Sequence, residues 1–178
     1  RHVTEVLAPQ QITSCDKTSF GCNGGFTESA YNYVKNAGGI ETDASYPYTS
    51  GTAGITGTCK SSSSKFVVGI TGYKTVSSSA RGESDMASYV ASTGPLSVCV
   101  DAESWSSYTG GVMKICGNSV DHCVQAVGLN PEASTPYWIV RNSWGVTWGE
   151  KGYIYLEYGD NTCQVASDAT YTTGASAV

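Results

Sequence analysis

Seven cysteines constrain the fold of this 178-residue chain more than any other sequence feature. That number is high for a cytosolic protein of this size, and the spacing contains no paired CxxC units of the kind that bind zinc. Disulfide bonds are therefore the expected use of these residues. Because seven is odd, at least one thiol stays free or bonds to something outside the chain. The cysteines are Cys15, Cys22, Cys59, Cys99, Cys116, Cys123 and Cys163.

The composition is that of a globular chain and argues against several classes of partner. A hydrophobic content of 40% can bury a core in one or two compact lobes. The ten lysines and arginines are scattered over a chain of net charge −5, which argues against nucleic-acid binding. No apolar run approaches the roughly 20 residues that span a membrane. The first residues lack a signal-peptide pattern, so the chain begins after processing or was never exported. No metal or organic cofactor is implied.

Hydrophobic periodicity predicts one clear helix near the beginning of the chain. Residues 26–37 place apolar side chains at helical spacing, and Gly38-Gly39 supplies a C-terminal stop. Residues 50–64 are rich in Gly, Thr and Ser, which predicts a loop.

From residue 66 onward the pattern changes to short strands. Residues 66–76 are followed by a short helical candidate at 83–91 and then by β-branched or aromatic runs bounded by turn residues. These runs are residues 94–102, 123–128, 137–141 and 152–156. We therefore expect an α+β chain, with residues 1–64 as the remainder of a helical lobe and residues 65–178 as mainly an antiparallel β-barrel lobe.

A histidine and an asparagine about 20 residues apart have the chemistry of a thiol-activating pair. An imidazolium stabilises a nearby thiolate, and the same ring then protonates a leaving amine. His122 suits this role, whereas the other histidine, His2, lies at a chain end where solvation is the default. Asn142 would hydrogen-bond the ring and fix its rotation, and Trp144 would cover that bond from water. Asp121 is expected to be a loop carboxylate without proton chemistry.

Five stretches of the chain, in family order, resemble the papain family of cysteine proteases, in particular its cathepsin L branch and protist relatives. They are SCDKTSFGCNGG at 14–25, YPYTS at 46–50, GPLSVCVDA at 94–102, VDHCVQAVG at 120–128 and WIVRNSWGVTWGEKGYIYLEYGDNTCQVAS at 138–167. The resemblance covers nearly the whole chain. It implies a papain-like fold of two lobes, a helical left lobe and a β-barrel right lobe. It also implies thiol protease activity with His122 and Asn142 as catalytic residues.

The resemblance implies a nucleophile that this sequence does not contain. In the family the attacking cysteine lies in a Gln-x-x-Cys-Gly-x-Cys-Trp segment at the start of the long left-lobe helix, and the match here begins after that helix. None of the seven cysteines has that context. We therefore expect the larger C-terminal portion, or heavy chain, of a cysteine endopeptidase, inactive without the missing segment. The alternatives are a non-catalytic papain-fold structural or assembly protein, and a proteolytic fragment.

By the same resemblance, four cysteines form two bridges and one points outside the chain. Cys15 is expected to pair with Cys59, and Cys116 with Cys163. The family partner of Cys22 lies in the missing segment, so Cys22 is expected to link this chain to a separate N-terminal chain or segment. The alternative is that Cys22 is a free thiol. A disulfide-bonded, acidic chain suits an extracellular, lysosomal or vacuolar location.

The resemblance also implies residues that bind a polypeptide substrate. Gly24-Gly25 matches the backbone edge that pairs with an extended peptide, where a side chain would obstruct the approach. Trp148 matches a wall on the leaving-group side, and the alternative is that it is a plain core residue. The positions that line the pocket for the second residue before the cut are Phe26, Thr27, Cys99 and Cys123, with the cysteines acting as small hydrophobes. The alternative is that these four are core or helix-start residues.

Asp168 matches the floor of that pocket, by counting from Cys163. A carboxylate there would admit Arg or Lys as well as Phe or Leu, because charges pair strongly in a poorly solvated site. The alternative is that Asp168 turns outward to solvent.

Overall fold

The computed structural model describes residues 4–178, which divide into two compact units. Unit 1 is the chain up to Tyr73 together with Thr172–Val178, and unit 2 is Lys74–Tyr171. Unit 1 contains most of the helices and unit 2 most of the strands, and the predicted α+β class is confirmed. The division expected between residues 64 and 65 falls just before β1 (Val68–Gly69), a strand that the structure assigns to unit 1.

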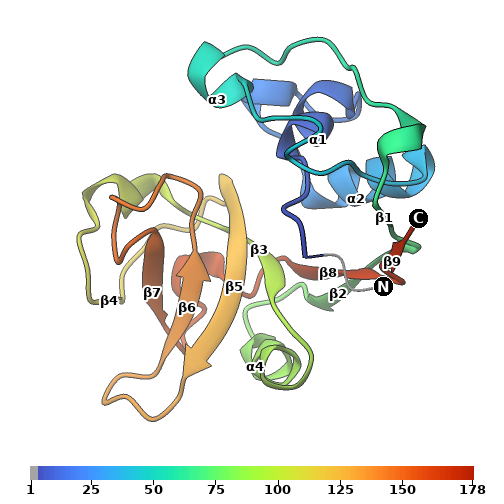
Figure 1. The fold of residues 1–178 in the computed structure, drawn as a ribbon. Helices are drawn as coiled ribbons and strands as arrows, with labels where there is room; N and C mark the ends of the chain where they lie inside the picture. The colour runs from blue at the N-terminus through green and yellow to red at the C-terminus, as the bar shows by residue number, and fades with distance from the viewer. Residues whose placement is uncertain (1–3) are drawn as a thin grey trace. The chain divides into compact units, whose positions relative to one another are not determined.

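Unit 1 consists of short helices and a two-stranded sheet (Figure 1). Its α-helices are α1 (Pro9–Cys15), α2 (Thr27–Ala37) and α3 (Ser50–Ala53). Its 3₁₀ turns are η1 (Gly21–Asn23) and η2 (Ser63–Lys65). β1 pairs antiparallel with β9 (Ser176–Ala177), so the end of the chain returns to this unit.

Helix α2 matches the helix predicted from the sequence. It begins at Thr27 and ends at Ala37, and Gly38 follows with a left-handed φ of 88°. Glycine adopts this conformation without steric cost, so the chain turns away where the sequence indicated. Helix α3, a single turn, lies within the segment 50–64 that was predicted as loop.

Helix α1 was not predicted, because the face that it buries is polar. Gln10 and Gln11 are almost completely buried. The Gln10 side chain donates to Ser50 Oγ (2.7 Å) and accepts from the Ser50 backbone N–H (2.9 Å). Gln11 accepts from the Glu41 backbone N–H (2.8 Å). Buried amides with full hydrogen bonding stabilise the helix but give no apolar periodicity to detect.

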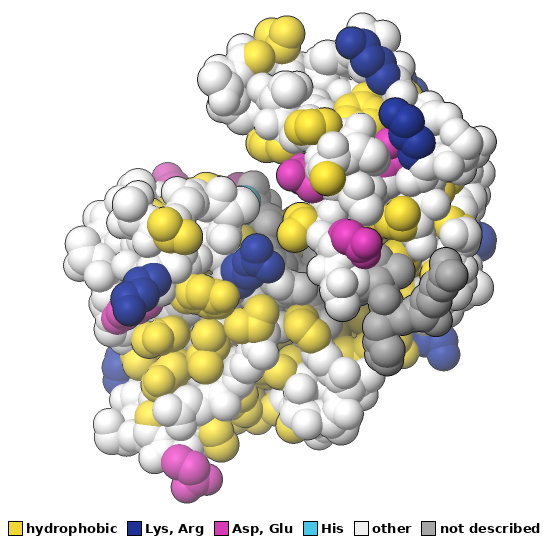
Figure 2. All heavy atoms as spheres, viewed as in Figure 1, with side chains coloured by type: hydrophobic (Ala, Val, Ile, Leu, Met, Phe, Trp, Pro, Cys, Tyr) yellow, Lys and Arg dark blue, Asp and Glu magenta, His cyan; other side chains and the backbone are white. Residues whose placement is uncertain are grey.

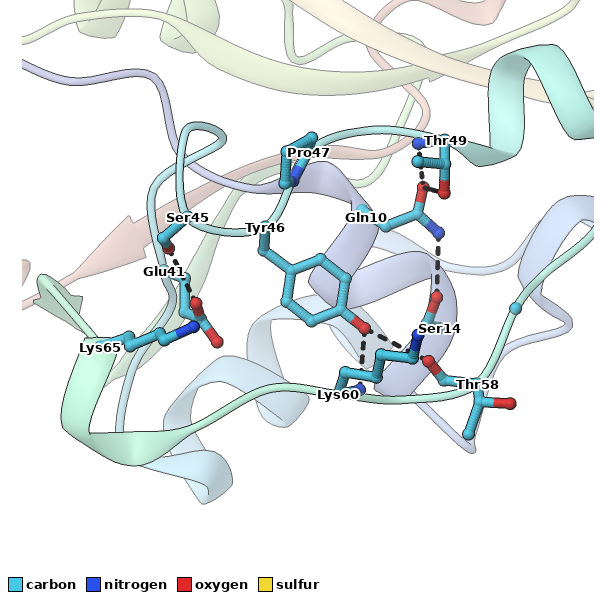
Figure 3. A pocket seen from close by; sticks show the side chains of 11 residues that line it. Gln10, Ser14, Glu41, Ser45, Tyr46, Pro47, Thr49, Thr58, Lys60 and Lys65 are labelled. Carbon is cyan, nitrogen blue, oxygen red and sulfur yellow. Dashed lines mark hydrogen bonds between the residues drawn. The ribbon is translucent and has the colours of Figure 1, made fainter.

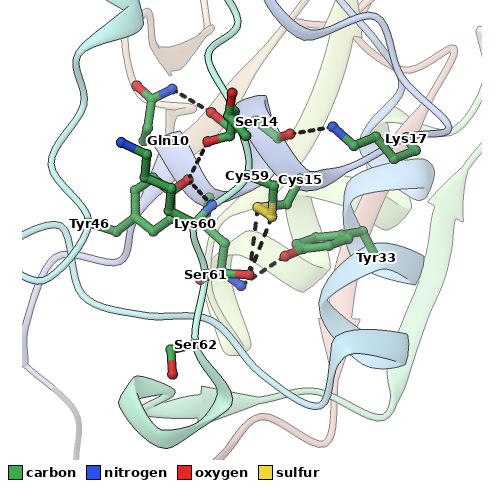
Figure 4. The surroundings of a disulfide bond; sticks show 12 residues. Gln10, Ser14, Cys15, Lys17, Tyr33, Tyr46, Cys59, Lys60, Ser61 and Ser62 are labelled. Carbon is green, nitrogen blue, oxygen red and sulfur yellow. Dashed lines mark hydrogen bonds between the residues drawn. A yellow bond between two sulfur atoms is a disulfide. The ribbon is translucent and has the colours of Figure 1, made fainter.

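A disulfide fixes the end of α1 to a distant loop, as the resemblance implied (Figure 4). Cys15, the last residue of α1, is bonded to Cys59, at a sequence separation of 44. Ser61 Oγ lies 3.6 Å from each of the two sulfur atoms. In the chain-entropy description, a loop of this length stabilises the fold by about 4 kcal/mol.

Unit 2 is built on a seven-stranded sheet with the order β2-β8-β3-β5-β6-β7-β4 (Figure 1). β5 pairs antiparallel with β3 on one side and with β6 on the other. β4 pairs parallel with β7. The strands are β2 (Gly72–Ser77), β3 (Leu96–Val100), β4 (Val112–Met113), β5 (His122–Asn130), β6 (Tyr137–Arg141), β7 (Tyr153–Glu157) and β8 (Ala169–Thr173). The strand runs predicted from residue 66 onward therefore form this sheet, apart from β1.

One hydrophobic core fills unit 2. Trp105, Trp138, Leu96 and Leu156 are completely buried in it. Helix α4 (Glu83–Ser92), predicted near residues 83–91, packs against β5 and contributes Met86. Two 3₁₀ turns, η3 (Glu103–Ser107) and η4 (Thr162–Gln164), connect the strands.

The alternation of side chains along β6 gives the sheet a buried face and an outward face. Trp138 and Val140 are buried, whereas Tyr137 and Ile139 are half-buried. Tyr137 packs against Tyr155 of β7, with ring centroids 4.6 Å apart. In Figure 2, hydrophobic side chains gather over this part of the visible face, and charged side chains are dispersed. The period-2 pattern of the sequence thus determines which side chains of β6 face the core.

A buried carboxylate ties α4 to the sheet. Glu83, the first residue of α4, is 5% exposed. Its Oε1 accepts from the Trp138 indole N–H (2.7 Å), and its Oε2 accepts from the backbone N–H groups of Gly159 (3.0 Å) and Asn161 (2.8 Å). Three donors and the helix N-terminus together compensate for burying the charge.

Replacing Glu83 should therefore destabilise unit 2 strongly. Glu83→Ala leaves three buried donors without an acceptor, and we expect a loss of about 3 kcal/mol in the free energy of unfolding. Asp85→Ala, at an exposed position of the same helix, should cost about 0.5 kcal/mol or less. Urea unfolding followed by tryptophan fluorescence measures both. Equal losses in the two variants would contradict this account.

Candidate active site

Strand pairing brings the predicted base and its orienting amide to one edge of the sheet. β5 begins at His122, and β6 ends at Arg141, directly before Asn142. The strands are antiparallel, with Gln125 opposite Arg141. The beginning of β5 therefore lies beside the end of β6.

The imidazole and the amide form a short hydrogen bond. His122 Nε2 lies 2.8 Å from Asn142 Oδ1, and Asn142 is buried. The same oxygen accepts the backbone N–H of Ser143 (2.8 Å), which fixes the amide with its oxygen toward both donors. Nε2 must then be the protonated nitrogen of the neutral ring. His122 Nδ1 is left for a reacting group.

Tryptophans surround the His122–Asn142 pair. The Trp144 ring is stacked on the imidazole (centroids 5.3 Å apart, interplanar angle 24°) and is itself 43% exposed. It therefore covers one face of the imidazole, and its shielding of the His122–Asn142 hydrogen bond from water stays a prediction. Trp148, predicted as a wall of the leaving-group side, packs edge-on against Trp144 (5.2 Å) and stacks on Trp105 (5.9 Å).

Trp105 belongs to this group, although sequence reasoning did not select it. Its ring is completely buried and meets His122 edge-on, with centroids 6.1 Å apart. Its backbone carbonyl accepts the indole N–H of Trp148 (3.1 Å). Trp105 and Trp144 thus both contact His122, and Trp148 packs against both of these tryptophans. The sequence has only four tryptophans, and this rarity was the one feature that could have drawn attention to Trp105. It does not indicate which residues Trp105 contacts.

Asp121 has the loop role expected of it. Its Oδ1 accepts the backbone N–H of Ala102 (2.8 Å), and its own N–H donates to Val100 O (3.0 Å). Both bonds hold the loop that leads into β5.

The prediction that Cys99 and Cys123 act as separate small hydrophobes is wrong, because the two form a disulfide. Their place in the wall of the substrate pocket stays a prediction. The register of β3 and β5 places Cys99 directly opposite Cys123, with a Cα–Cα distance of 4.0 Å. Cys116 and Cys163 form the remaining bridge, as the resemblance implied.

Asp168 lies beside the Cys99–Cys123 bridge. It directly precedes β8, is half-buried, and accepts the backbone N–H of Cys99 through its carbonyl oxygen (3.0 Å). Unit 2 therefore brings together three of the residues predicted to line the substrate pocket. The direction of the Asp168 carboxylate relative to a substrate stays a prediction.

The predicted substrate residues of unit 1 surround a small cavity. Gly24, Gly25, Phe26 and Thr27 all line a space of about 210 Å³. Gly24 has a φ of 101°, and a Cβ on Gly25 would lie 2.5 Å from the side chain of Ser19. Glycine is therefore required at both positions for steric reasons, whatever the ligand. Phe26 precedes α2 and is 63% exposed.

Cys22 is the one cysteine outside the three bridges. It lies in η1 with its side chain exposed. Its backbone N–H donates to Thr56 Oγ1 (3.2 Å), which holds the turn. His2, the other histidine, lies outside the described residues.

Residues 2–173 match the family described as papain family cysteine protease. The chain belongs to this family. A cysteine proteinase 1 of Dictyostelium discoideum is 44% identical over 178 residues, covering 90% of this chain and 50% of that protein. Human cathepsin O is 37% identical over 168 residues, covering 93% and 51%. The chain thus spans about half the length of these relatives.

The papain-like fold is likewise confirmed by solved structures. The bromelain protease from Ananas comosus, in a complex with the E64 inhibitor, superposes with a TM-score of 0.82 at 35% identity. The superposition covers 96% of this chain and 79% of bromelain. Family membership and fold therefore agree with the motifs around His122 and Asn142.

The larger cavity of unit 1 contains none of the predicted site residues of this papain-family chain (Figure 3). It measures about 380 Å³, and its lining includes Tyr46, Glu41 and Lys65. Glu41 accepts from Ser45 Oγ (2.8 Å), and the Tyr46 hydroxyl accepts the backbone N–H of Lys60 (2.9 Å). These bonds join loops to one another. The polar groups named here are therefore used within the loops of unit 1.

The Nε2–H proton of His122 should exchange slowly with water, because Asn142 binds it and Trp144 covers it. Asn142→Ala removes the acceptor, and we expect exchange about tenfold faster, equivalent to roughly 1.4 kcal/mol for one hydrogen bond. Trp144→Ala should have a smaller effect in the same direction. Nitrogen-15 NMR of the imidazole measures both.

Asn130→Ala is the matched control for this experiment. Asn130 is the last residue of β5, the strand that begins with His122. Its amide N–H donates to Tyr137 Oη (3.2 Å), away from the histidine. Its loss should leave the imidazole signal unchanged. If Asn142→Ala also left the exchange unchanged, the assigned hydrogen bond would be wrong.

Proposed function

We propose that this chain is the larger, C-terminal portion of a cysteine endopeptidase whose nucleophilic thiol comes from a segment outside these 178 residues. The observation that most directly supports this proposal is the His122–Asn142 hydrogen bond, which leaves Nδ1 of the imidazole for a thiol. Six cysteines are used in bridges. The seventh, Cys22, has no Gln-x-x-Cys-Gly-x-Cys-Trp context.

In the proposed reaction the thiol gives its proton to His122 Nδ1, forming a thiolate and an imidazolium. The sulfur attacks the peptide carbonyl carbon, and the C–N bond breaks as the imidazolium donates the proton to the leaving amine. His122 Nδ1 then takes a proton from the water that attacks the thioester. The acid leaves, and the imidazolium returns its proton to the thiolate, which restores the thiol and the neutral ring. Throughout, Nε2–H stays bonded to Asn142, so the ring keeps its orientation. A neutral amide orients the ring without neutralising the ion pair.

The partner that we propose is an N-terminal chain or segment bonded to Cys22. The exposure of this thiol and its exclusion from the three bridges support that role. Such a link would keep the nucleophile with its base after the chain is nicked. The substrate would be a polypeptide.

The bridges also support an oxidising location, either extracellular or lysosomal or vacuolar. Three disulfides in a chain of this size are unusual in the cytosol. Within residues 4–178, no helix is both long and apolar enough to cross a bilayer.

The native material should release a short peptide when it is reduced. We expect the intact mass to fall by that of a chain bearing Gln-x-x-Cys-Gly-x-Cys-Trp, bonded at Cys22. The joined chains should cleave a Phe-Arg reporter peptide. His122→Ala should lower kcat/KM by about 10³-fold and Asn142→Ala by about 10–100-fold, since the first removes the base and the second its orientation.

Two controls make this experiment decisive. Cys22→Ser should prevent covalent attachment of the peptide while leaving the three bridges intact. Reduction of this variant should therefore release no peptide. A partner segment with Ser in place of its nucleophile should bind but give no turnover. An unchanged mass, with no turnover on adding the partner segment, would instead support a non-catalytic papain-fold protein or a proteolytic fragment.

Asp168 should determine whether the joined enzyme accepts a basic residue two positions before the cut. We expect Asp168→Asn to reduce Arg-Arg reporter cleavage by about tenfold relative to Phe-Arg cleavage, because one charge pair is lost. Asp160→Asn, in an exposed turn, should leave the ratio unchanged. If an active enzyme did not cleave Arg-Arg at all, the carboxylate would not face the pocket.

A further inference from the structure

His122 lies at the end of a strand ladder, where the chain leaves the sheet. The last two residue pairs between β3 and β5 are Cys99 with Cys123 and Val100 with His122. Residues 117–121, just before His122, are all exposed. Ends of ladders next to exposed loops open more easily than the centre of a sheet. A base placed there needs additional fixation.

The Cys99–Cys123 pair has no direct backbone hydrogen bond from the Cys99 amide. That N–H points to the other side of β3, where it donates to Asp168 O (3.0 Å). The Cα–Cα distance of 4.0 Å agrees with a non-hydrogen-bonded pair, whose usual spacing is about 4.5 Å. At this pair the Cys99 amide makes no hydrogen bond to β5, and the disulfide joins the two strands instead.

A second bridge anchors the other side of the same segment. Residues 117–122 lie between Cys116, bonded to Cys163, and Cys123, bonded to Cys99. Cys163 also contacts the tryptophan that faces the histidine, because the Trp105 indole N–H lies 3.4 Å from its sulfur. The segment that contains His122 is thus covalently held at both ends within unit 2.

The bridge acts through the backbone and not by touching the imidazole. Neighbouring residues of a strand point to opposite faces, so Cys123 lies on the other face from His122. His122 shares its face with Val124 and Ala126, which are buried in the core. A change at the bridge can reach the imidazole only by moving the end of β5.

We propose that the Cys99–Cys123 disulfide is a positioning pair for His122. It joins β3 and β5 at the pair directly before the last one of their ladder, Val100 with His122, so that the imidazole keeps its hydrogen bond to Asn142. The functional meaning of this role rests on the proposed protease activity, but the positioning itself is a property of unit 2. It is measured without any turnover.

The test compares hydrogen exchange at two ring N–H groups of the same chain. In a His2→Gln background His122 is the only histidine, so the imidazole signal is unambiguous. The Trp138 indole N–H, bonded to Glu83 in the core, reports the stability of unit 2 as a whole. In Cys99→Val/Cys123→Ala, we expect the His122 N–H to exchange at least tenfold faster relative to Trp138.

Cys15→Ala/Cys59→Ala is the matched control, since it removes a bridge of unit 1. It should leave the ratio of the two exchange rates unchanged. If Cys99→Val/Cys123→Ala changed both rates equally, or neither, the bridge would have only a general stabilising role and the proposal would be overturned. In the joined enzyme, the same variant should lower kcat more than it raises KM.

A second measurement applies if the variant does not fold. The unmodified chain is treated with increasing dithiothreitol, which reduces the disulfide to two thiols and becomes a cyclic disulfide itself. Alkylation and mass mapping identify when Cys99 and Cys123 are open. Loss of His122 protection at that point, with the Trp138 signal intact, supports the proposal, and retained protection refutes it. Failure to obtain turnover would instead count against the proposed function alone.

Discussion

The pairing of β5 with both of its neighbours is the constraint on which the rest of unit 2 depends. On one side the register with β3 places Cys123 opposite Cys99, and on the other the register with β6 brings Asn142 beside His122. The same strand contributes Val124 and Ala126 to the core. A slip of one residue would move His122 to the opposite face and bury polar side chains in place of apolar ones. Burial of the core therefore enforces the geometry of the candidate active site.

Buried polar side chains also hold secondary-structure elements of this fold together, a role that apolar contacts usually have. Glu83 holds α4, β6 and the turn after β7 through three hydrogen bonds, and Gln10 and Gln11 do the same for α1. Each is buried and satisfied, and removing any one would leave several donors or acceptors unpaired. Such residues limit the chain to one arrangement because few alternatives would satisfy all of their partners.

The sequence alone predicted the parts of the structure that have local signals. Helix α2 follows from spacing and its glycine stop, and the strands follow from short β-branched or aromatic runs. The roles expected for His122 and Asn142 came from their chemistry together with a family resemblance. The Cys99–Cys123 bridge was missed because it depends on the register of two strands, which neither cysteine encodes locally. Trp105 and α1 were missed for related reasons: the first is defined by distant partners, and the second buries amides without apolar periodicity.

The position of the imidazole is determined by contacts that leave one nitrogen unused. A histidine side chain rotates about two bonds. Here the ring meets Asn142 at one edge, the face of Trp144 on one side and Trp105 edge-on. Only two torsion angles have to be fixed, and three contacts act on the ring. Its orientation is therefore over-determined once the backbone is fixed. The paired strands and the two bridges around residues 117–122 fix that backbone. Because none of these contacts uses Nδ1, the same arrangement that immobilises the ring leaves that nitrogen for the thiol of the proposed mechanism.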